Sequence, residues 1–403
     1  MRNIKIFKTV KEPLITISLA LCAFSLSMPT FYFNLALSIA FLTRVVYLNK
    51  RDFALVFYSK LFKTIFISMV LIIIGFIYTK VENYNIGITL FIKRIPFLLI
   101  PFLFIGVTKR IVKFTLIGFL LGVFVGSLIC LINVSITENV YGYIKQIYIS
   151  NWYWNSIILD PIDKHPSYFS IYACLSFFIG LDFFLNDKRS IFKIFYTLLM
   201  LFFVGIILTL EARIVIITFP LVFLVYLIFK TRKILIGLAF FMLLTIFGTF
   251  YFIHHPARFH NIRILKLPKD LNIRMDIYDA ATNLISKNPL FGVGSGDITQ
   301  SLNTEYILKG HNYIINYNCH NQFFEEWARG GLLSFMALVV IFILMMKNAI
   351  AQNKTIFLVF LLMMIIFSLV ESYLNRQQGI TFFIFFGALF YYYHVDYNYE
   401  KSQ

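Results

Sequence analysis

The sequence predicts an all-α polytopic membrane protein with about 12 transmembrane helices and one large loop outside the membrane. The first observation is composition: of 403 residues, 60% are hydrophobic and only 14% are charged. A soluble protein has about 25% charged residues, so a chain this poor in charge cannot cover a globular surface. The second observation is a series of long apolar runs, and the third is how Lys and Arg are distributed between them. A soluble or disordered protein is therefore excluded.

A spanning helix needs about 20 mostly apolar residues, and about twelve runs approach this length. The predicted spans are residues 14–28, 31–48, 57–79, 87–107, 114–134, 166–185, 192–210, 213–229, 234–253, 330–346, 355–372 and 379–394. The first run follows several Lys and Arg residues and resembles a signal peptide. It has no clear small-x-small cleavage site and passes directly into the second run, so we expect a retained helix.

The positive charge of the chain has a topological explanation. Lys and Arg total 36 against 19 Asp and Glu, which gives a net charge of +17. Cytoplasmic connections hold the excess of Lys and Arg in membrane proteins. Alternate connections here are basic, as at Lys50-Arg51 and Lys230, whereas the others are sparse. Both termini are therefore predicted to be cytoplasmic, and no nucleic-acid partner is expected.

Two segments are too polar and too long to be membrane spans, and by the alternation both lie outside. We therefore divide the chain into residues 1–253, with a smaller outer loop at 135–165, the large outer loop 254–329, and the C-terminal spans and short tail 330–403. Within the large loop, apolar residues of RMDIYDAATNLI recur at helical spacing after Arg274, and Lys287-Asn288-Pro289 stops the pattern. We predict that Arg274 opens a helix there.

Two arginines on the predicted outer face could bind an anion. Arg213 lies between two apolar runs beside Glu211, where an ionisable residue suggests function by default. The alternative is that Arg213 reaches lipid headgroups or pairs with Glu211. After the helix of Arg274, the sequence NPLFGVGSGD could expose backbone N–H groups to anionic oxygens. A plain turn is the favoured interpretation, because no strand precedes these glycines and no helix opens on them.

His320 lies in CHNQFFEEWARGGLL, just before an apolar run, so its imidazole should lie near the outer membrane surface. A neutral histidine can accept a proton from a hydroxyl group near neutral pH, although a structural loop histidine is the commoner case. Asn321 is an accessory candidate beside it. His165 either caps the helix that Pro166 starts or joins the same outer cleft. Glu371 and Arg376 are further accessory candidates, with a local ion pair as the simpler interpretation.

No metal site is predicted. His254, His255 and His260 have no carboxylate or cysteine at ligand spacing. The 4 cysteines form no CxxC pair, so neither a disulfide framework nor redox chemistry is expected.

Taken together, these features resemble the O-antigen ligase and Wzy-type polymerase superfamily of bacterial envelope glycan assembly. The resemblance is sharpest from Arg274 to Leu333, where an Arg-led helix, NPLFGVG and HNQF followed by GGLL occur in the family's order. The Glu-Ala-Arg at 211–213 matches the family's earlier outer arginine.

The resemblance implies a GT-C-type glycosyltransferase in the bacterial inner membrane, with the large loop and the active site facing the periplasm. It implies no cofactor and a glycan donor carried on undecaprenyl diphosphate. Arg213 and Arg274 would bind the donor diphosphate, and His320 would activate the acceptor hydroxyl. The expected function is an O-antigen ligase that transfers the glycan to lipid A–core with inversion and without metal.

Two alternatives remain open from the sequence. A polymerase would use the same donor and chemistry with another glycan as acceptor. A flippase or transporter would require ionisable residues near the middle of helices and symmetry between halves. Lys93-Arg94 is the only charged pair within an assigned span, and no internal repeat is visible.

Overall fold

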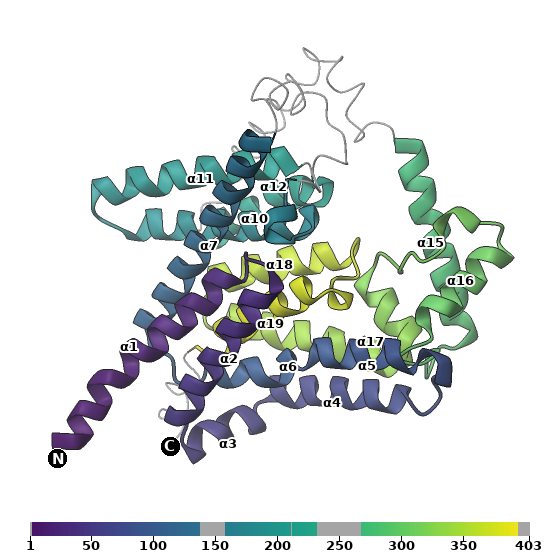
Figure 1. Cartoon of the computed structure of the whole chain (residues 1–403), viewed down its shortest axis with the longest axis horizontal. Helices are drawn as coiled ribbons and strands as arrows, with labels where there is room; N and C mark the ends of the chain where they lie inside the picture. Colours follow the sequence, from purple (N-terminus) through teal and green to yellow (C-terminus); the bar gives the residue numbers. More distant parts are fainter. Residues whose placement is uncertain (1, 138–157, 211, 232–266, 394–403) are drawn as a thin grey trace, which may run out of the picture.

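The computed structural model describes residues 2–137, 158–210, 212–231 and 267–393, and every regular element in these ranges is helical (Figure 1). Within these ranges, seven helices are long and apolar enough to cross a membrane, or eight if one bent pair counts as a single span. This agrees with a polytopic membrane protein. Helices cover all the predicted runs except 234–253, which lies outside the described residues. Two of them, at 355–368 and 377–392, are shorter than a full span, so the number of twelve spans stays a prediction.

The helices fall into three sequential groups. The first comprises α1 (Arg2–Ser25), α2 (Thr30–Tyr47), α3 (Lys50–Tyr58), α4 (Lys60–Gly75), η1 (Val81–Asn83), α5 (Tyr84–Arg94), α6 (Pro96–Leu99), η2 (Ile100–Leu103) and α7 (Lys109–Thr137). The second comprises η3 (Asp160–Ile162), α10 (Pro166–Asn186), α11 (Ser190–Leu210) and α12 (Arg213–Thr231). The third comprises α15 (Leu267–Lys287), α16 (Ile298–Leu308), η4 (Asn312–Ile314), α17 (Gln322–Ala351), α18 (Thr355–Ser368), η5 (Tyr373–Asn375) and α19 (Gln377–Tyr392).

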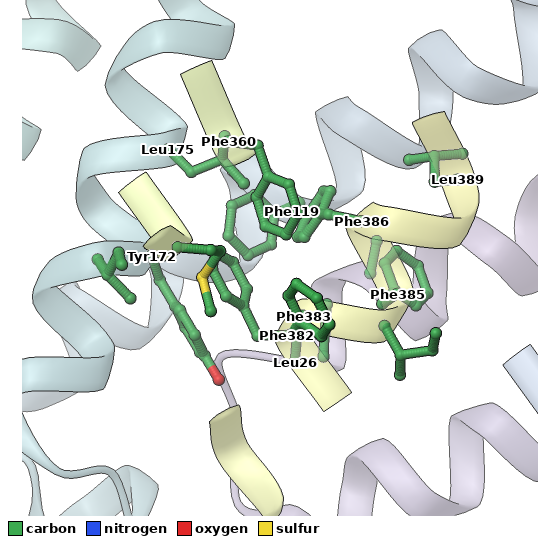
Figure 2. Packing of buried hydrophobic residues seen from close by; sticks show 14 of the residues in the cluster. Leu26, Phe119, Tyr172, Leu175, Phe360, Phe382, Phe383, Phe385, Phe386 and Leu389 are labelled. Atoms are coloured by element: carbon green, nitrogen blue, oxygen red, sulfur yellow. The ribbon is translucent and has the colours of Figure 1, made fainter. Parts of the chain in front are cut away.

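Helix α19 forms the centre of the main core. Its residues from Gly379 to Phe390 are all buried, which is typical of a helix enclosed on every side. Phe382 stacks on Tyr172 of α10 with ring centroids 4.4 Å apart, and Phe386 meets Phe119 of α7 edge-on at 4.7 Å (Figure 2). Aromatic pairs of this kind add about 0.5–1.5 kcal/mol beyond the area that they bury. The core therefore fixes α19 against helices from all three groups.

Glycine lets α7 approach α1 closely. A Cβ on Gly118 would lie 2.3 Å from the carbonyl oxygen of Ala20, and one on Gly122 would lie 2.2 Å from that of Phe24. Small residues four apart are a common solution for packing two helices within a membrane. The long α7 and α1 therefore lie directly against each other.

Helix α17 is kinked at Gly330-Gly331, where Gly331 has φ of 70°. The kink frees carbonyl groups that are normally bonded within a helix. Arg329 O accepts a hydrogen bond from Gly294 N at 3.0 Å, and Ala328 O accepts one from Val293 N at 2.9 Å. The kink thus attaches the loop between α15 and α16 to α17.

Helices α15 and α16 form a separate small core with the start of α17, and they lie to one side of the bundle (Figure 1). The predicted stop at Lys287 is confirmed, because α15 ends there. The predicted start is wrong: α15 begins at Leu267, about two turns before Arg274. Helix α17 likewise begins at Gln322, within the segment that we assigned to the large loop.

Two of the basic connections lie together at one end of the bundle. Lys230, at the end of α12, and Lys354, before α18, line the same pocket. Lys354 Nζ also donates a hydrogen bond to the carbonyl of Tyr393, 2.7 Å away, just after α19. Since α12 packs on α18, the start of α12 and the end of α18 share the opposite end. Arg213, at the start of α12, and Glu371, after the end of α18, therefore lie at that opposite end.

Candidate active site

His320 occupies a strained backbone position just before α17. Its φ is 45°, in the left-handed region that non-glycine residues rarely adopt. Its N–H donates to Asn318 Oδ1 at 2.9 Å, and its carbonyl accepts from the Tyr278 hydroxyl at 3.3 Å. Such a conformation costs about 1–3 kcal/mol and occurs often at functional sites. These contacts hold the backbone of His320 in this conformation.

Glu371, in the segment between α18 and η5, is the carboxylate that faces this imidazole. His320 Nδ1 is buried, has no hydrogen bond, and lies 3.6 Å from Glu371 Oε2. Catalytic contacts are often this long in the absence of substrate. A proton on Nδ1 directed at Glu371 leaves the lone pair of Nε2 for a hydroxyl group. The pair therefore places a carboxylate where it can orient the imidazole.

The surroundings of Glu371 favour its ionised form. Burial alone would raise the pKa of the Glu371 carboxyl, but pairing with His320, together with His165 and Arg376, lowers it below its ordinary value. The Tyr168 hydroxyl lies 3.4 Å from the other carboxylate oxygen. Glu371 is therefore an ionised group beside the imidazole.

His165 caps α10, as one of the two sequence interpretations held. Its Nδ1 accepts a hydrogen bond from Ser167 N at 3.3 Å, and Pro166 is the first residue of the helix. Burial lowers the pKa of His165, and the charge of Arg376 acts in the same direction. The ring also packs edge-on against Tyr168 at 5.9 Å. His165 thus lies at the border of the site as a helix cap.

The expected local ion pair of Glu371 with Arg376 is absent from the described part of the chain, where Glu371 pairs with His320 instead. Arg376 is exposed and directly precedes α19. Its charge reaches the site only through its effect on the pKa values of Glu371 and His165. The Arg376 side chain is therefore exposed to solvent near Glu371 and His165.

The two arginines differ in how closely the structure ties them to His320. Arg274 Nη1 donates to the carbonyl of Val370 at 3.0 Å, directly before Glu371. Arg213 is the first residue of α12, and α12 packs on α18, which leads to Glu371. Glu211 lies outside the described residues. Arg274 is thus fixed at the site, while Arg213 lies at the same end of the bundle.

Asn321 has a structural use. Its side-chain oxygen accepts hydrogen bonds from Phe323 N at 2.9 Å and Phe324 N at 3.2 Å, so it caps α17. Because it directly follows His320, the cap also fixes where the chain leaves the strained position.

The glycine-rich loop is a packing turn, as the favoured interpretation held. Gly292 N donates to Asn288 O, Gly294 N to Arg329 O, and Gly296 N to Thr79 Oγ1. These N–H groups are therefore occupied and do not face an anion. His254, His255 and His260, for which the sequence predicts no metal site, lie outside the described residues. Elsewhere in the described ranges, no group of three or more potential metal ligands gathers.

The sequence analysis missed a buried ionic cluster beside this site. Arg94 of α5 makes a bidentate ion pair with Glu326 of α17, and Arg329 pairs with both Glu326 and Glu325. All four side chains are at most 6% exposed. The sequence does contain a signal for this cluster. Arg94 is a charged residue inside an apolar run, and such a residue needs a partner.

The fold and the site are therefore those of a multi-pass helical membrane protein that holds a histidine–carboxylate pair at one end of its bundle. Residues 197–339 match the family model of the O-antigen ligase domain, Wzy_C. This match confirms, for this part of the chain, the resemblance to the O-antigen ligase and Wzy superfamily found in the sequence. The matched range contains Arg213, Arg274 and His320. No curated protein matches the chain.

The family points to an enzyme of O-antigen assembly whose substrate is a glycan or a lipid-linked glycan in the membrane. Glu371 and His165 lie outside the matched residues. Their association with His320 therefore comes from the three-dimensional arrangement.

Proposed function

We propose that the protein is an O-antigen ligase of the bacterial inner membrane, with its active site facing the periplasm. It transfers a glycan from undecaprenyl diphosphate to lipid A–core with inversion. The observation that carries the proposal is the His320–Glu371 pair, with Arg274 bound to the residue before Glu371. The position of Lys230 and Lys354 at the other end of the bundle supports the orientation.

In the proposed reaction, the acceptor hydroxyl oxygen attacks the anomeric carbon of the donor sugar. Its proton moves to His320 Nε2, and Glu371 stabilises the imidazolium that forms. The bond from the anomeric carbon to the diphosphate oxygen breaks, and undecaprenyl diphosphate leaves with the electron pair. Displacement on the face opposite the leaving group inverts the anomeric centre.

The arginines are proposed to bind the leaving diphosphate. A guanidinium group has five N–H donors in a planar fork that suits phosphate oxygens, and only Nη1 of Arg274 is used by the Val370 carbonyl. Negative charge develops on the diphosphate as the bond breaks, and fixed cations stabilise it. Guanidinium groups can supply this stabilisation, so the proposal includes neither a metal nor a cofactor.

Replacing Arg274 by Ala is expected to lower kcat/KM for the lipid-linked donor by about 100-fold, since one charge-assisted contact is worth about 1.5–3 kcal/mol. Arg274→Lys should recover part of the loss, because a lysine keeps the charge without the fork. Steady-state kinetics on purified variants test this. Lys309→Ala is the control. Lys309 pairs with Asp279, which lies in α15 as Arg274 does, but away from His320. Full activity of Arg274→Ala would remove Arg274 from the donor site.

Replacing Glu371 by Gln is expected to lower kcat by about 10-fold, because the imidazole loses its orienting charge while the side-chain volume is kept. The KM for donor should change little. Glu82→Gln is the control, since Glu82 contacts Gln300 at a distance of 3.2 Å and no residue of the site. An unchanged kcat in Glu371→Gln would separate Glu371 from the reaction.

Deletion of the gene distinguishes the ligase from the polymerase alternative. A ligase deletion should leave long glycans on the lipid carrier and bare lipid A–core, whereas a polymerase deletion should leave single repeat units on the core. Gel analysis of lipopolysaccharide with complementation by the wild-type gene reads out the difference. Single-unit capping would overturn the ligase assignment.

A further inference from the structure

One buried carboxylate joins the two chain segments that carry His320 and Glu371. We propose that Glu325 is a positioning residue for the transfer reaction, holding His320 and Glu371 opposite each other. The inference rests on the proposed function, because it acts through the base of that reaction. Glu325 itself lies in the first turn of α17 and does not contact the imidazole.

A single oxygen of Glu325 makes the connection. Its Oε2 accepts a hydrogen bond from Cys319 N at 3.0 Å and one from Ser372 Oγ at 3.3 Å. Cys319 directly precedes His320, and Ser372 directly follows Glu371. The two residues that must meet are therefore each one peptide from a contact with the same atom.

The second oxygen fixes the carboxylate in place. Oε1 of Glu325 accepts from Arg329 Nη2 at 2.8 Å and from Asn375 Nδ2 at 2.7 Å. In the same turn, Gln322 Oε1 accepts from Leu374 N at 2.7 Å. The segment Ser372–Asn375 is thus bound to the first turns of α17 at several points. Movement of that segment, which would carry Glu371 away from His320, requires breaking these bonds.

The hydrogen bonds made by Glu325 require a carboxylate at this position. Four donors converge on Glu325, and only an ionised carboxylate accepts from both of its oxygens at every lone-pair position. An amide at this position would turn an NH2 group toward two of these donors. The Glu325 side chain is 1% exposed, so water does not replace a lost contact. His320 depends on such contacts, because its backbone holds a conformation that it would otherwise leave.

Two variants test the inference in a transfer assay on the full-length protein. Ser372→Ala removes one donor to Oε2, and Glu325→Gln reverses the polarity of one oxygen. Each is expected to lower kcat by about 10-fold with KM for the donor within about 2-fold, since a small misplacement of reacting groups acts on the chemical step. Ser368→Ala is the matched control: Ser368 and Ser372 are both 0% exposed, and Ser368 bonds to Met364 O instead.

A double variant separates positioning from general structural damage. If Glu325 acts through the His320–Glu371 pair, Glu325→Gln should cost less in a Glu371→Gln background than in the wild type, because the pair is already impaired. Fully multiplicative losses, or a rise in KM and a fall in Tm that parallel the fall in kcat, would show a structural role and overturn the inference.

The same assay distinguishes failure of the inference from failure of the proposed function. If His320→Asn is inactive while Ser372→Ala and Glu325→Gln keep the wild-type kcat, the inference is wrong and the proposed base stands. If His320→Asn keeps full activity, the proposed mechanism is wrong and the positioning role falls with it.

Discussion

Replacing His320 by Ala or Asn is expected to lower glycan transfer by about 10²–10⁴-fold, the range that a general base contributes. The imidazole takes the proton of the attacking hydroxyl, and neither substitute can do so at neutral pH. Asn is the more informative substitute, because it tolerates the left-handed backbone that His320 adopts. Loss of activity in His320→Asn therefore reports the missing base and not a disturbed loop.

Transfer should be measured under saturating donor with purified variants of equal monodispersity. His311→Ala is the matched control, because His311 lies in the same segment between α16 and α17 but faces Asp276 at 3.6 Å. Wild-type transfer by His320→Asn would contradict the assignment of the base.

Replacing Glu326 by Ala is expected to destabilise the protein by about 3–5 kcal/mol, the cost of leaving a buried ion without its partner. Arg94 is 5% exposed and would lose both contacts to the Glu326 carboxylate. Arg329 would retain only its contacts to Glu325 and Asn375. The Tm in detergent should fall strongly, and the yield of folded protein should fall with it.

Replacing both Arg94 and Glu326 by Met provides the test when the single variant cannot be purified. Without either charge, no buried ion is left unpaired, so the double variant should be more stable than Glu326→Ala. If the double variant is no more stable, or if Glu326→Ala unfolds at the wild-type temperature, the ion pair does not carry the expected energy.

Local pattern sufficed to predict most of the helices. Apolar runs located α10, α11 and α12 to within a few residues, and Pro166 located the start of α10. The start of α15 was missed, because the residues before Arg274 carry no clear apolar periodicity. The kink at Gly330-Gly331 follows from contacts with a loop distant in sequence, and the motif alone does not specify such contacts.

The candidate site, too, could be predicted from the sequence only in part. His320 and Arg213 could be proposed from the sequence because they stand out as polar residues at the ends of apolar runs, and Arg274 because it precedes a helical apolar pattern in the large loop. The pairing of His320 with Glu371, and the link that Glu325 makes between them, depend on how α17, α18 and η5 meet. Such tertiary contacts have no local sequence signature. Asn321 was proposed as an accessory residue because it lies beside His320. In the structure it is the N-cap residue of α17.

The most direct test of the proposed ligase reaction is a reconstituted assay with purified protein, a glycan on undecaprenyl diphosphate and rough lipopolysaccharide, run with a chelator present. We expect a glycan joined to lipopolysaccharide with inverted anomeric configuration. This product should form in the presence of the chelator and should be absent with the His320→Asn variant. A longer glycan left on the lipid carrier would show a polymerase instead. If neither product forms under conditions where another ligase is active, the proposed transfer reaction is contradicted.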